Sequence, residues 1–194
     1  MSEFDKMISS NYYDSCDKEL TNLRLRAHRL SKEYNDLLEN DSKRKEILLN
    51  LFPNAKINES FIQGPIQIDY GINTTFGKNF YANFNLTILD SAKVEIGDNV
   101  FIGPNVSIYT AYHDLEYKKR NVIFDDNLNM HCIELAKPIS IGSNCWIGGG
   151  ATILAGVKIG SGVVVGAGSV ITKDICDNVV VAGNPAKIIR YINN

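Results

Sequence analysis

The sequence lacks the marks of several classes of protein. Its formal net charge is only −2, so the charge balance does not favour a nucleic-acid partner or an anionic membrane surface. No apolar run approaches the roughly 20 residues that a bilayer-spanning helix needs. The first residues, Met-Ser-Glu-Phe-Asp-Lys, are charged and contain no apolar core of a signal peptide. We therefore expect a cytoplasmic protein with no nucleic-acid or membrane partner.

Cysteine is sparse and scattered along the chain. Its four cysteines form no CxxC pair, and zinc sites need clustered ligands. The sequence therefore predicts no metal site and four reduced thiols, packed mostly as small apolar groups. These cysteines are Cys16, Cys132, Cys145 and Cys176.

Glycine is absent before Pro53, and this first part of the chain has a helical pattern. A shorter helix is expected around Phe4, and a break at residues 40–42 separates the main helix from a third one that ends at Pro53. Residues 1–55 are therefore predicted to form a small α-helical cap. The apolar stripe of its main helix comprises Leu20, Leu23, Ala27, Leu30, Tyr34 and Leu37, at spacings of three and four.

After Pro53 glycine becomes frequent and an aliphatic residue returns at every sixth position. A period of six fits neither an amphipathic helix nor a plain hairpin, so it indicates a repeat architecture. Glycine follows the aliphatic residue in most of these units. The series comprises Ile141, Ile147, Ile153, Ile159, Val165 and Ile171, and an earlier run comprises Ile96, Ile102 and Ile108.

A triangular prism explains this period. Each six-residue unit makes one short strand and one turn, and three units close one coil. Coils then stack with parallel strands, so each aliphatic residue points to the axis and stacks on its equivalent eighteen residues later. Glycine is expected where φ is positive or where a side chain would clash. We predict a mainly β protein, with a parallel β-helix over residues 56–190 and a tail at 191–194.

The repeat is interrupted between Ile108 and Ile141. The intervening sequence is polar, charged and aperiodic, so it must leave the prism as a long loop over about residues 111–138. Such loops are often functional. This one carries two of the three histidines, His113 and His131.

Together these features resemble the maltose/galactoside O-acetyltransferases, which are hexapeptide-repeat acyltransferases with a left-handed parallel β-helix. The resemblance implies a homotrimer with active sites between subunits. It also implies acetyl-CoA as the co-substrate and direct acetyl transfer to a hydroxyl of a maltose-, glucose- or galactoside-type sugar. The segments that carry it are "NLRLRAHRL" (22–30), "DYGINTTFGKNFYANFNLTILD" (69–90), "IGDNVFIGPNVSIYTAYH" (96–113), "ELAKPISIGSNCWIGGGA" (134–151) and "GAGSVITKDICDNVVVAGNPAKII" (166–189).

Acetyl transfer to a hydroxyl needs a base, because a neutral hydroxyl is a poor nucleophile. His113 ends the motif "YTAYH" at the family's catalytic position and is our predicted general base. Glu134, which opens "ELAKP", is predicted to orient its ring. The resemblance also assigns Asn83 and the backbone N–H of Gly149 to the reacting groups, where they would stabilise an oxyanion.

The glycine-rich units match neither a P-loop nor a dinucleotide fingerprint. The resemblance instead implies that coenzyme A lies along the edges of the coils. Lys187 stands where some members have arginine, which weakens a bidentate phosphate contact. The implied cofactor residues are Trp146, Gly149, Ala167, Thr172, Lys173, Lys187 and Arg190.

For the acceptor, the resemblance implies an acidic residue of the cap, and Asp14, Ser15 and Asp17 remain open for this role. The sequence "HD" replaces the usual "HP" after the catalytic histidine, and the loop is longer than in the better-known members, so the sugar stays open too. His28 is expected on the cap surface, and His131 has no motif support. The implied substrate residues are Asp17, Asp69, Tyr81 and Asp90.

Three alternatives compete with a sugar O-acetyltransferase. A related acyltransferase with a non-sugar acceptor such as serine would have a larger helical N-terminal domain. A β-helical carbonic anhydrase needs three histidine ligands, and only two histidines lie outside the cap. A non-catalytic scaffold would leave the base and cofactor positions unmatched, whereas all of them are filled.

Overall fold

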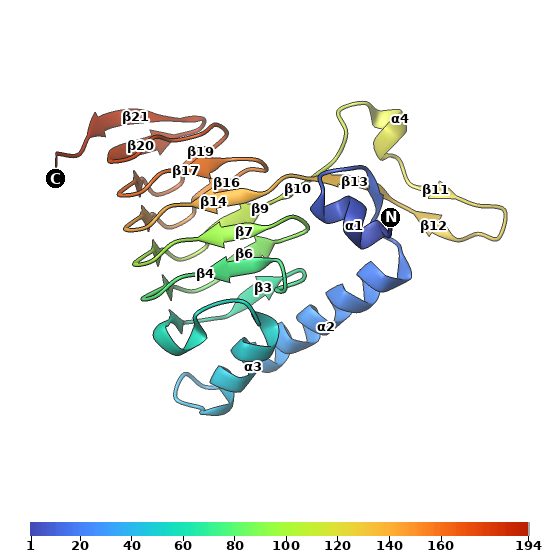
Figure 1. Ribbon diagram of the computed structural model, residues 1–194, viewed down its shortest axis with the longest axis horizontal. Helices are drawn as coiled ribbons and strands as arrows, with labels where there is room; N and C mark the ends of the chain where they lie inside the picture. Colours follow the sequence, from blue (N-terminus) through green and yellow to red (C-terminus); the bar gives the residue numbers. More distant parts are fainter. Residues whose placement is uncertain (194) are drawn as a thin grey trace.

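The structure is a computed structural model that describes residues 1–193. The N-terminal part contains α1 (Glu3–Ile8), β1 (Tyr13–Asp14), α2 (Lys18–Asn35) and α3 (Lys43–Leu51), as Figure 1 shows. Ser2 and Asp17 cap the first two helices through their side chains. The third helix ends just before Pro53, as predicted.

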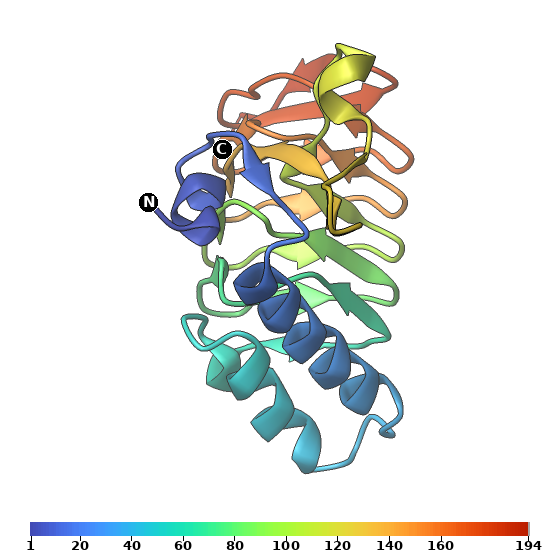
Figure 2. The same ribbon diagram turned by 90° about the vertical axis from the view of Figure 1, so that its right-hand side faces the viewer.

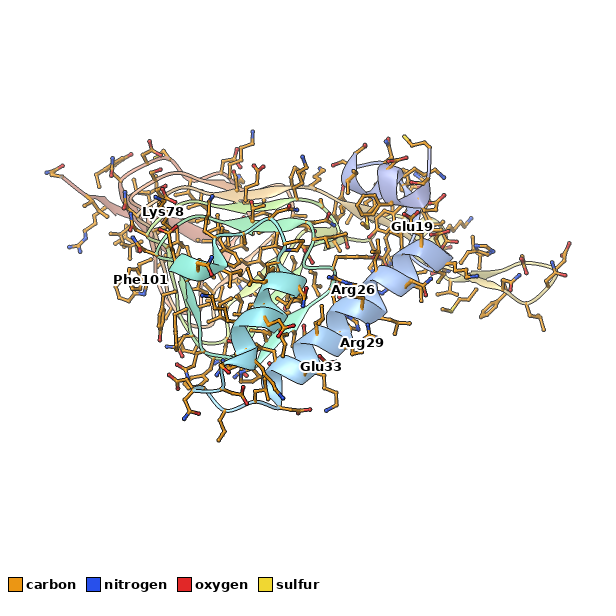
Figure 3. All side chains as sticks on the ribbon, turned by 60° about the horizontal axis from the view of Figure 1, so that its bottom comes forward. Glu19, Arg26, Arg29, Glu33, Lys78 and Phe101 are labelled. Carbon is orange, nitrogen blue, oxygen red and sulfur yellow. The ribbon has the colours of Figure 1, made fainter. Side chains whose placement is uncertain are left out.

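The long helix α2 packs its apolar stripe against the first coils of the prism, and it crosses them obliquely in Figure 2. Leu20, Ala27 and Tyr34 of the predicted stripe are buried. Figure 3 shows the charged side chains along the other side of this helix, among them Glu19, Arg29 and Glu33, which are exposed. Within residues 1–193, no helix is both long and apolar enough to cross a membrane.

After the short helix η1 (Ile57–Glu59), three sheets form the faces of a prism, which confirms the predicted parallel β-helix (Figure 1). The final strand β21 is the exception, since it returns antiparallel to β20. The seven-stranded sheet contains β2 (Phe61–Ile62), β5 (Tyr81–Ala82), β8 (Phe101–Ile102), β15 (Trp146–Ile147), β18 (Val164–Val165), β20 (Val179–Gly183) and β21 (Ala186–Tyr191). The five-stranded sheet contains β3 (Ile66–Ile68), β6 (Leu86–Leu89), β9 (Ser107–Tyr109), β16 (Thr152–Ile153) and β19 (Val170–Ile171). The four-stranded sheet contains β4 (Thr74–Phe76), β7 (Val94–Ile96), β14 (Ile139–Ile141) and β17 (Lys158–Ile159).

The register confirms the predicted stacking. Ile141 pairs with Ile159 on one face, and Ile153 pairs with Ile171 on another, each eighteen residues later. These side chains are almost completely buried along the axis. Each aliphatic residue removed from water stabilises the fold by roughly 1.5–3 kcal/mol, so the repeat builds the core.

Glycine at the position after the aliphatic residue is required by close approach. A Cβ on Gly148 would lie 2.6 Å from backbone atoms of Val165 and Ala167 in the next coil. The positive φ falls two residues further on, where Gly150 has φ 71°. Asparagine takes that position in other coils, as at Asn144, because it tolerates the left-handed conformation better than most residues.

Only one of the four cysteines has the packing expected of it. All four are free thiols, but Cys145 alone is buried, while Cys176 is exposed and the other two are partly exposed. The tail expected at residues 191–194 begins at the end of β21 and includes Asn194, which lies outside the described residues.

The interrupting loop has structure of its own. It contains β10 (Ala111–Tyr112), α4 (Tyr117–Arg120), the hairpin of β11 (Ile123–Phe124) and β12 (Met130–His131), and β13 (Ile133–Ala136). We call residues 114–132 the arm, and Figure 1 shows it projecting from the prism. β13 pairs antiparallel with β10 on one side and with β1 of the cap on the other. The loop is therefore tied to both the prism and the N-terminus.

Candidate functional site

Three of the predicted residues, Asn83, Gly149 and Ala167, lie along one edge of the prism. Here each coil passes from the seven-stranded to the five-stranded sheet. The Asn83 N–H donates to the carbonyl of Ile102 at 2.9 Å, and the Gly149 carbonyl accepts from Gly168 N–H at 2.9 Å. Within residues 1–193, the Gly149 N–H donates no hydrogen bond, so this donor is free for a ligand.

Beside this edge, aromatic rings form a row on the outer surface of the seven-stranded sheet. Tyr81 lies between Phe61 and Phe101, with ring centroids 5.7 and 5.9 Å apart. Trp146 pairs with Phe101 in the next strand, and both side chains are more than half exposed. Figure 3 shows Phe101 pointing away from the prism. Phe61 and Phe101 were not predicted from the sequence, although both directly precede the inward-pointing residue of their strand.

The Asn83 side chain is held by its neighbours. Its amide oxygen accepts from the Phe84 N–H at 2.7 Å, and its amide nitrogen lies 3.4 Å from the Tyr81 hydroxyl. The amide nitrogen therefore keeps a second hydrogen for a ligand. The predicted substrate residue Tyr81 is thus adjacent to the predicted oxyanion donor.

His113 lies at a different edge of the same prism. It follows β10, where the chain leaves the five-stranded sheet before it enters the four-stranded one. Thr172 and Lys173 follow β19 at the corresponding edge of a later coil and are exposed. His113 is exposed and lines a pocket of about 490 Å³ with Tyr112, Leu135 and residues 114–116. One chain therefore does not bring His113 and Asn83 to the same edge.

Glu134 lies next to His113 in the strand register. Tyr112 pairs with Leu135, and the same antiparallel register places His113, which follows β10, opposite Glu134 of β13. The Glu134 carboxylate accepts from the Tyr13 hydroxyl and from Ser15 Oγ, each at 3.0 Å. Within residues 1–193, no hydrogen bond joins it to the His113 ring. Burial, followed by the charge of Glu134, raises the pKa of Tyr13, so this hydroxyl stays protonated and donates.

Two of the four predicted substrate residues have carboxylates that accept hydrogen bonds from backbone N–H groups of the fold. Asp90 is fully buried and accepts from Tyr70 N–H at 2.8 Å and from Thr74 Oγ1 at 2.9 Å, and burial raises its pKa to about 6. Asp17 accepts from the first N–H groups of α2 as its N-cap. Asp90 therefore holds a turn of the prism, and Asp17 holds the start of a helix.

Asp69 is partly exposed on the cap side of the site. Its carboxylate lies 3.3 Å from His28 Nε2, and burial raises its pKa. Arg24, which was not predicted as a site residue, donates through Nη1 to the Ser15 carbonyl and the Tyr70 hydroxyl, each at 3.0 Å. Burial acts to lower the pKa of Arg24, but the Tyr70 hydrogen bond and the charges of Asp69 and Glu134 outweigh it and raise the pKa. The feature of the sequence that could have indicated Arg24 is its place in the cap segment "NLRLRAHRL".

His131 joins the arm to the cap. Its Nδ1 lies 2.6 Å from Asp14 Oδ2, and its Nε2 lies 3.7 Å from Asp125. The other oxygen of Asp14 accepts from the backbone N–H groups of Cys16 and Cys132, each at 3.0 Å. Among the open cap residues, Asp14 therefore anchors the loop, whereas Ser15 contacts Glu134 directly.

The remaining cofactor residues lie at the far end of the seven-stranded sheet. Lys187 and Arg190 are exposed on β21, which is three strands beyond Trp146 in the sheet order. At about 4.8 Å between strands, this separation is roughly 14 Å. Within residues 1–193, no group of three or more histidine, cysteine, aspartate or glutamate side chains is arranged to hold a metal ion.

Comparisons with known proteins match both parts of this architecture. Residues 6–56 match the maltose acetyltransferase hexapeptide capping motif, and residues 138–173 match six repeats of the bacterial transferase hexapeptide. The galactoside O-acetyltransferase of Escherichia coli is 41% identical over 94% of this chain and 85% of its own. The chain belongs to this family of hexapeptide-repeat acetyltransferases.

Solved structures of the family agree with the fold. A maltose O-acetyltransferase from Clostridium difficile is 42% identical, with a TM-score of 0.90, and covers 100% of this chain and 99% of its own. A hexapeptide-repeat acetyltransferase from Vibrio cholerae, solved in complex with acetyl coenzyme A, is 35% identical, with a TM-score of 0.84 and full coverage of both chains. The predicted family and fold class are therefore confirmed.

Proposed function

We propose that this acetyltransferase moves the acetyl group of acetyl-CoA directly to a hydroxyl of a sugar. The observation that carries this proposal is the placement of His113. It is an exposed histidine in a pocket, at the point where the prism opens into the loop, and it faces Glu134, which the cap anchors. A family member with this arrangement can present a base to a bound hydroxyl.

In the proposed mechanism His113 accepts the proton of the acceptor hydroxyl. The acceptor oxygen attacks the thioester carbonyl and forms a tetrahedral oxyanion. The Asn83 amide and the free Gly149 N–H stabilise that charge. The C–S bond then breaks, and the leaving thiolate takes the proton from His113. The acetyl ester and free coenzyme A are the products.

We propose that the enzyme is a homotrimer, because one chain cannot complete this site. Asn83 and His113 lie at different edges of the prism, so a site with both takes one residue from each of two neighbouring copies. A closed ring of three copies gives three equivalent sites. The exposed aromatic row lies beside the Asn83 edge, where a neighbouring copy or the cofactor would cover it.

The cofactor is proposed to run along the Asn83 edge. Trp146, Gly149 and Ala167 would line the pantetheine arm. Lys187 and Arg190 of the same copy, with Thr172 and Lys173 at the His113 edge of the neighbouring copy, would contact the coenzyme A phosphates. Exposed lysine and arginine side chains are suited to this role because phosphate oxygens are anionic acceptors. The V. cholerae protein, which was solved in complex with acetyl coenzyme A, supports a coenzyme A site on this fold.

The acceptor is proposed to enter from the cap side. Asp69, which is partly exposed, and Tyr81 of the neighbouring copy would bind its hydroxyls. Ser15 and Arg24 extend the polar surface around Glu134. We do not assign Asp17 and Asp90 to the acceptor, because their carboxylates already accept hydrogen bonds within the fold.

A thiol-release assay tests the function. Purified protein is mixed with acetyl-CoA and a panel that includes maltose, glucose, several galactosides and L-serine, and His113→Ala is assayed in parallel. We expect acetylation of at least one sugar and a loss of about 100-fold or more in His113→Ala. Transfer to serine but not to sugars would show that the acceptor is a non-sugar hydroxyl compound. No transfer to any hydroxyl compound would reject the function.

A further inference from the structure

Two of the four cysteines lie close together where the cap meets the arm, and the proposed mechanism uses neither of them. Cys16 follows β1 in the cap, and Cys132 is the last residue of the arm, directly before β13. The two positions are more than 100 residues apart in the chain. Both side chains are partly exposed, so core packing does not explain this pair of thiols.

The strand register and one carboxylate bring the two cysteines together. β1 pairs with β13, and the contact extends to Ser15, whose N–H donates to the Cys132 carbonyl at 2.9 Å. Asp14 Oδ1 accepts from the backbone N–H groups of both cysteines, each at 3.0 Å, so the two nitrogens are no more than about 6 Å apart. This separation of the backbones is compatible with a disulfide, whose Cα atoms lie roughly 4.4–6.8 Å apart.

The two thiols also affect each other electrostatically. Burial, followed by the charge of Asp14, raises the pKa of Cys16, while the backbone N–H of Cys132 acts in the opposite direction. Burial also raises the pKa of Cys132, and the charges of Glu134 and of an ionised Cys16 raise it further. A raised pKa keeps both thiols protonated at neutral pH, so their oxidation is slow there and becomes faster as pH rises.

An oxidant can reach the pair from solvent. Cys16 lines a pocket of about 510 Å³ between the cap and the arm, together with Leu128 and Met130 of the arm. Cys132 is partly exposed as well. Hydrogen peroxide is only slightly larger than water, so it can enter this pocket and meet the Cys16 thiol.

We propose that Cys16 and Cys132 form a redox modification site, at which hydrogen peroxide joins the two sulfurs in a reversible disulfide between the cap and the arm. One thiolate attacks the peroxide, the O–O bond breaks, and a sulfenic acid and hydroxide form. The other thiol attacks the sulfenic sulfur, so that an S–S bond forms and the S–O bond breaks. Together the thiols lose two electrons and two protons, and the peroxide becomes two molecules of water. This site does not depend on the proposed acetyl transfer.

The disulfide would hold the end of the arm to the cap covalently. In the reduced protein Asp14 holds the arm there through His131 and through the Cys132 N–H. A covalent link between residues so distant in the chain strongly restricts the unfolded state. We therefore expect oxidation to slow the opening of the arm.

Peptide mapping without reduction tests the site. The wild-type protein is treated with hydrogen peroxide at pH 8.5, the remaining thiols are alkylated, and the digest is analysed by mass spectrometry. We expect a pair of peptides that links Cys16 to Cys132, with two hydrogens lost, and its separation by dithiothreitol. Cys176→Ser removes the exposed thiol and should keep this link, whereas Cys132→Ser should not form it.

Limited proteolysis gives a second readout. At pH 8.5 the arm of the oxidised protein should be cleaved roughly ten-fold more slowly than the arm of the reduced protein, because cleavage follows the population of the opened arm. Cys16→Ser should be cleaved at the same rate with and without peroxide.

Three results would overturn the proposal. The first is separate alkylation of Cys16 and Cys132 in a sample whose exposed Cys176 has been oxidised. The second is a sulfinic acid at Cys16 or Cys132 without any link between them. The third is a link that leaves the rate of cleavage in the arm unchanged, which would reject the hold on the arm.

Discussion

Tyr13 donates a hydrogen bond of 3.0 Å to the Glu134 carboxylate and so connects the cap to the strand beside His113. Tyr13 is almost completely buried, and its strand pairs with Glu134 in register. The strand beside the proposed base is therefore anchored by a segment about 100 residues earlier in the chain than His113.

Tyr13→Phe should destabilise the protein and impair catalysis together. Loss of a buried hydrogen bond to a carboxylate costs roughly 1.5–3 kcal/mol in the free energy of unfolding. Because Glu134 keeps the Ser15 contact, kcat should fall several-fold while KM for acetyl-CoA stays constant. Urea denaturation and steady-state kinetics measure both. Tyr12→Phe is the matched control, since Tyr12 donates to Asp114 at the exposed surface, and equal effects of the two variants would contradict this role of Tyr13.

The His131–Asp14 pair should make the attachment of the arm depend on pH. Hydrogen bonding to Asp14 raises the pKa of His131 above 6.5. Burial acts to raise the pKa of Asp14, but hydrogen bonds from Cys132 and His131 outweigh it and lower the pKa. The stabilisation is therefore present between the two folded-state values. It is lost as pH rises through the His131 pKa, and also as pH falls through the Asp14 pKa.

Limited proteolysis of the arm measures this dependence. Wild-type protein should be cleaved faster in the arm at pH 8.5 than at pH 6, while His131→Gln should be cleaved at similar rates at both values. Rates should be corrected for the protease's own pH dependence with an unfolded substrate. If His131→Gln keeps the pH dependence of the wild type, another titratable group controls the attachment of the arm.

Two glycines of the prism should respond differently to substitution. Gly148→Ala would place a Cβ 2.6 Å from backbone atoms of the next coil, and overpacking of this kind costs about 1–3 kcal/mol. Gly168 has no atom within 4 Å of an added Cβ, but its φ is 69°. Gly168→Asn should therefore cost less than Gly168→Ala, and Gly148→Asn should cost more than Gly148→Ala. Thermal denaturation of the four variants checks this order, and a uniform effect would contradict it.

The sequence predicted the prism well because its information is local. Burial at Ile141, Ile147 and Ile153 follows directly from the period of six, and the family resemblance placed His113 and Glu134 near each other. The arm could not be predicted in this way. Its hairpin depends on the Asp125 turn, and the strand that follows it, β13, pairs with β1, which lies more than 100 residues away.

The residues predicted to bind the acceptor substrate show the same limit of prediction from local sequence. Asp17 stands directly before a helix and has the pattern of an N-cap, so its helical role was visible in the sequence. Asp90 gave no such signal, because the backbone groups that it binds belong to the turn after β3 in the preceding coil. Leu128 lay in an aperiodic segment, and only the structure shows its positive φ and the pocket beside it.

The central claim is that each active site combines His113 of one copy with Asn83 of its neighbour. Mixed trimers of His113→Ala and Asn83→Ala, carrying different affinity tags and isolated by both, test it most directly. In a ring with both kinds of subunit, one of the three interfaces regains both residues, so roughly a third of wild-type activity should return although each variant alone is inactive. Mixed trimers as inactive as their parents would show that the two residues do not act across an interface.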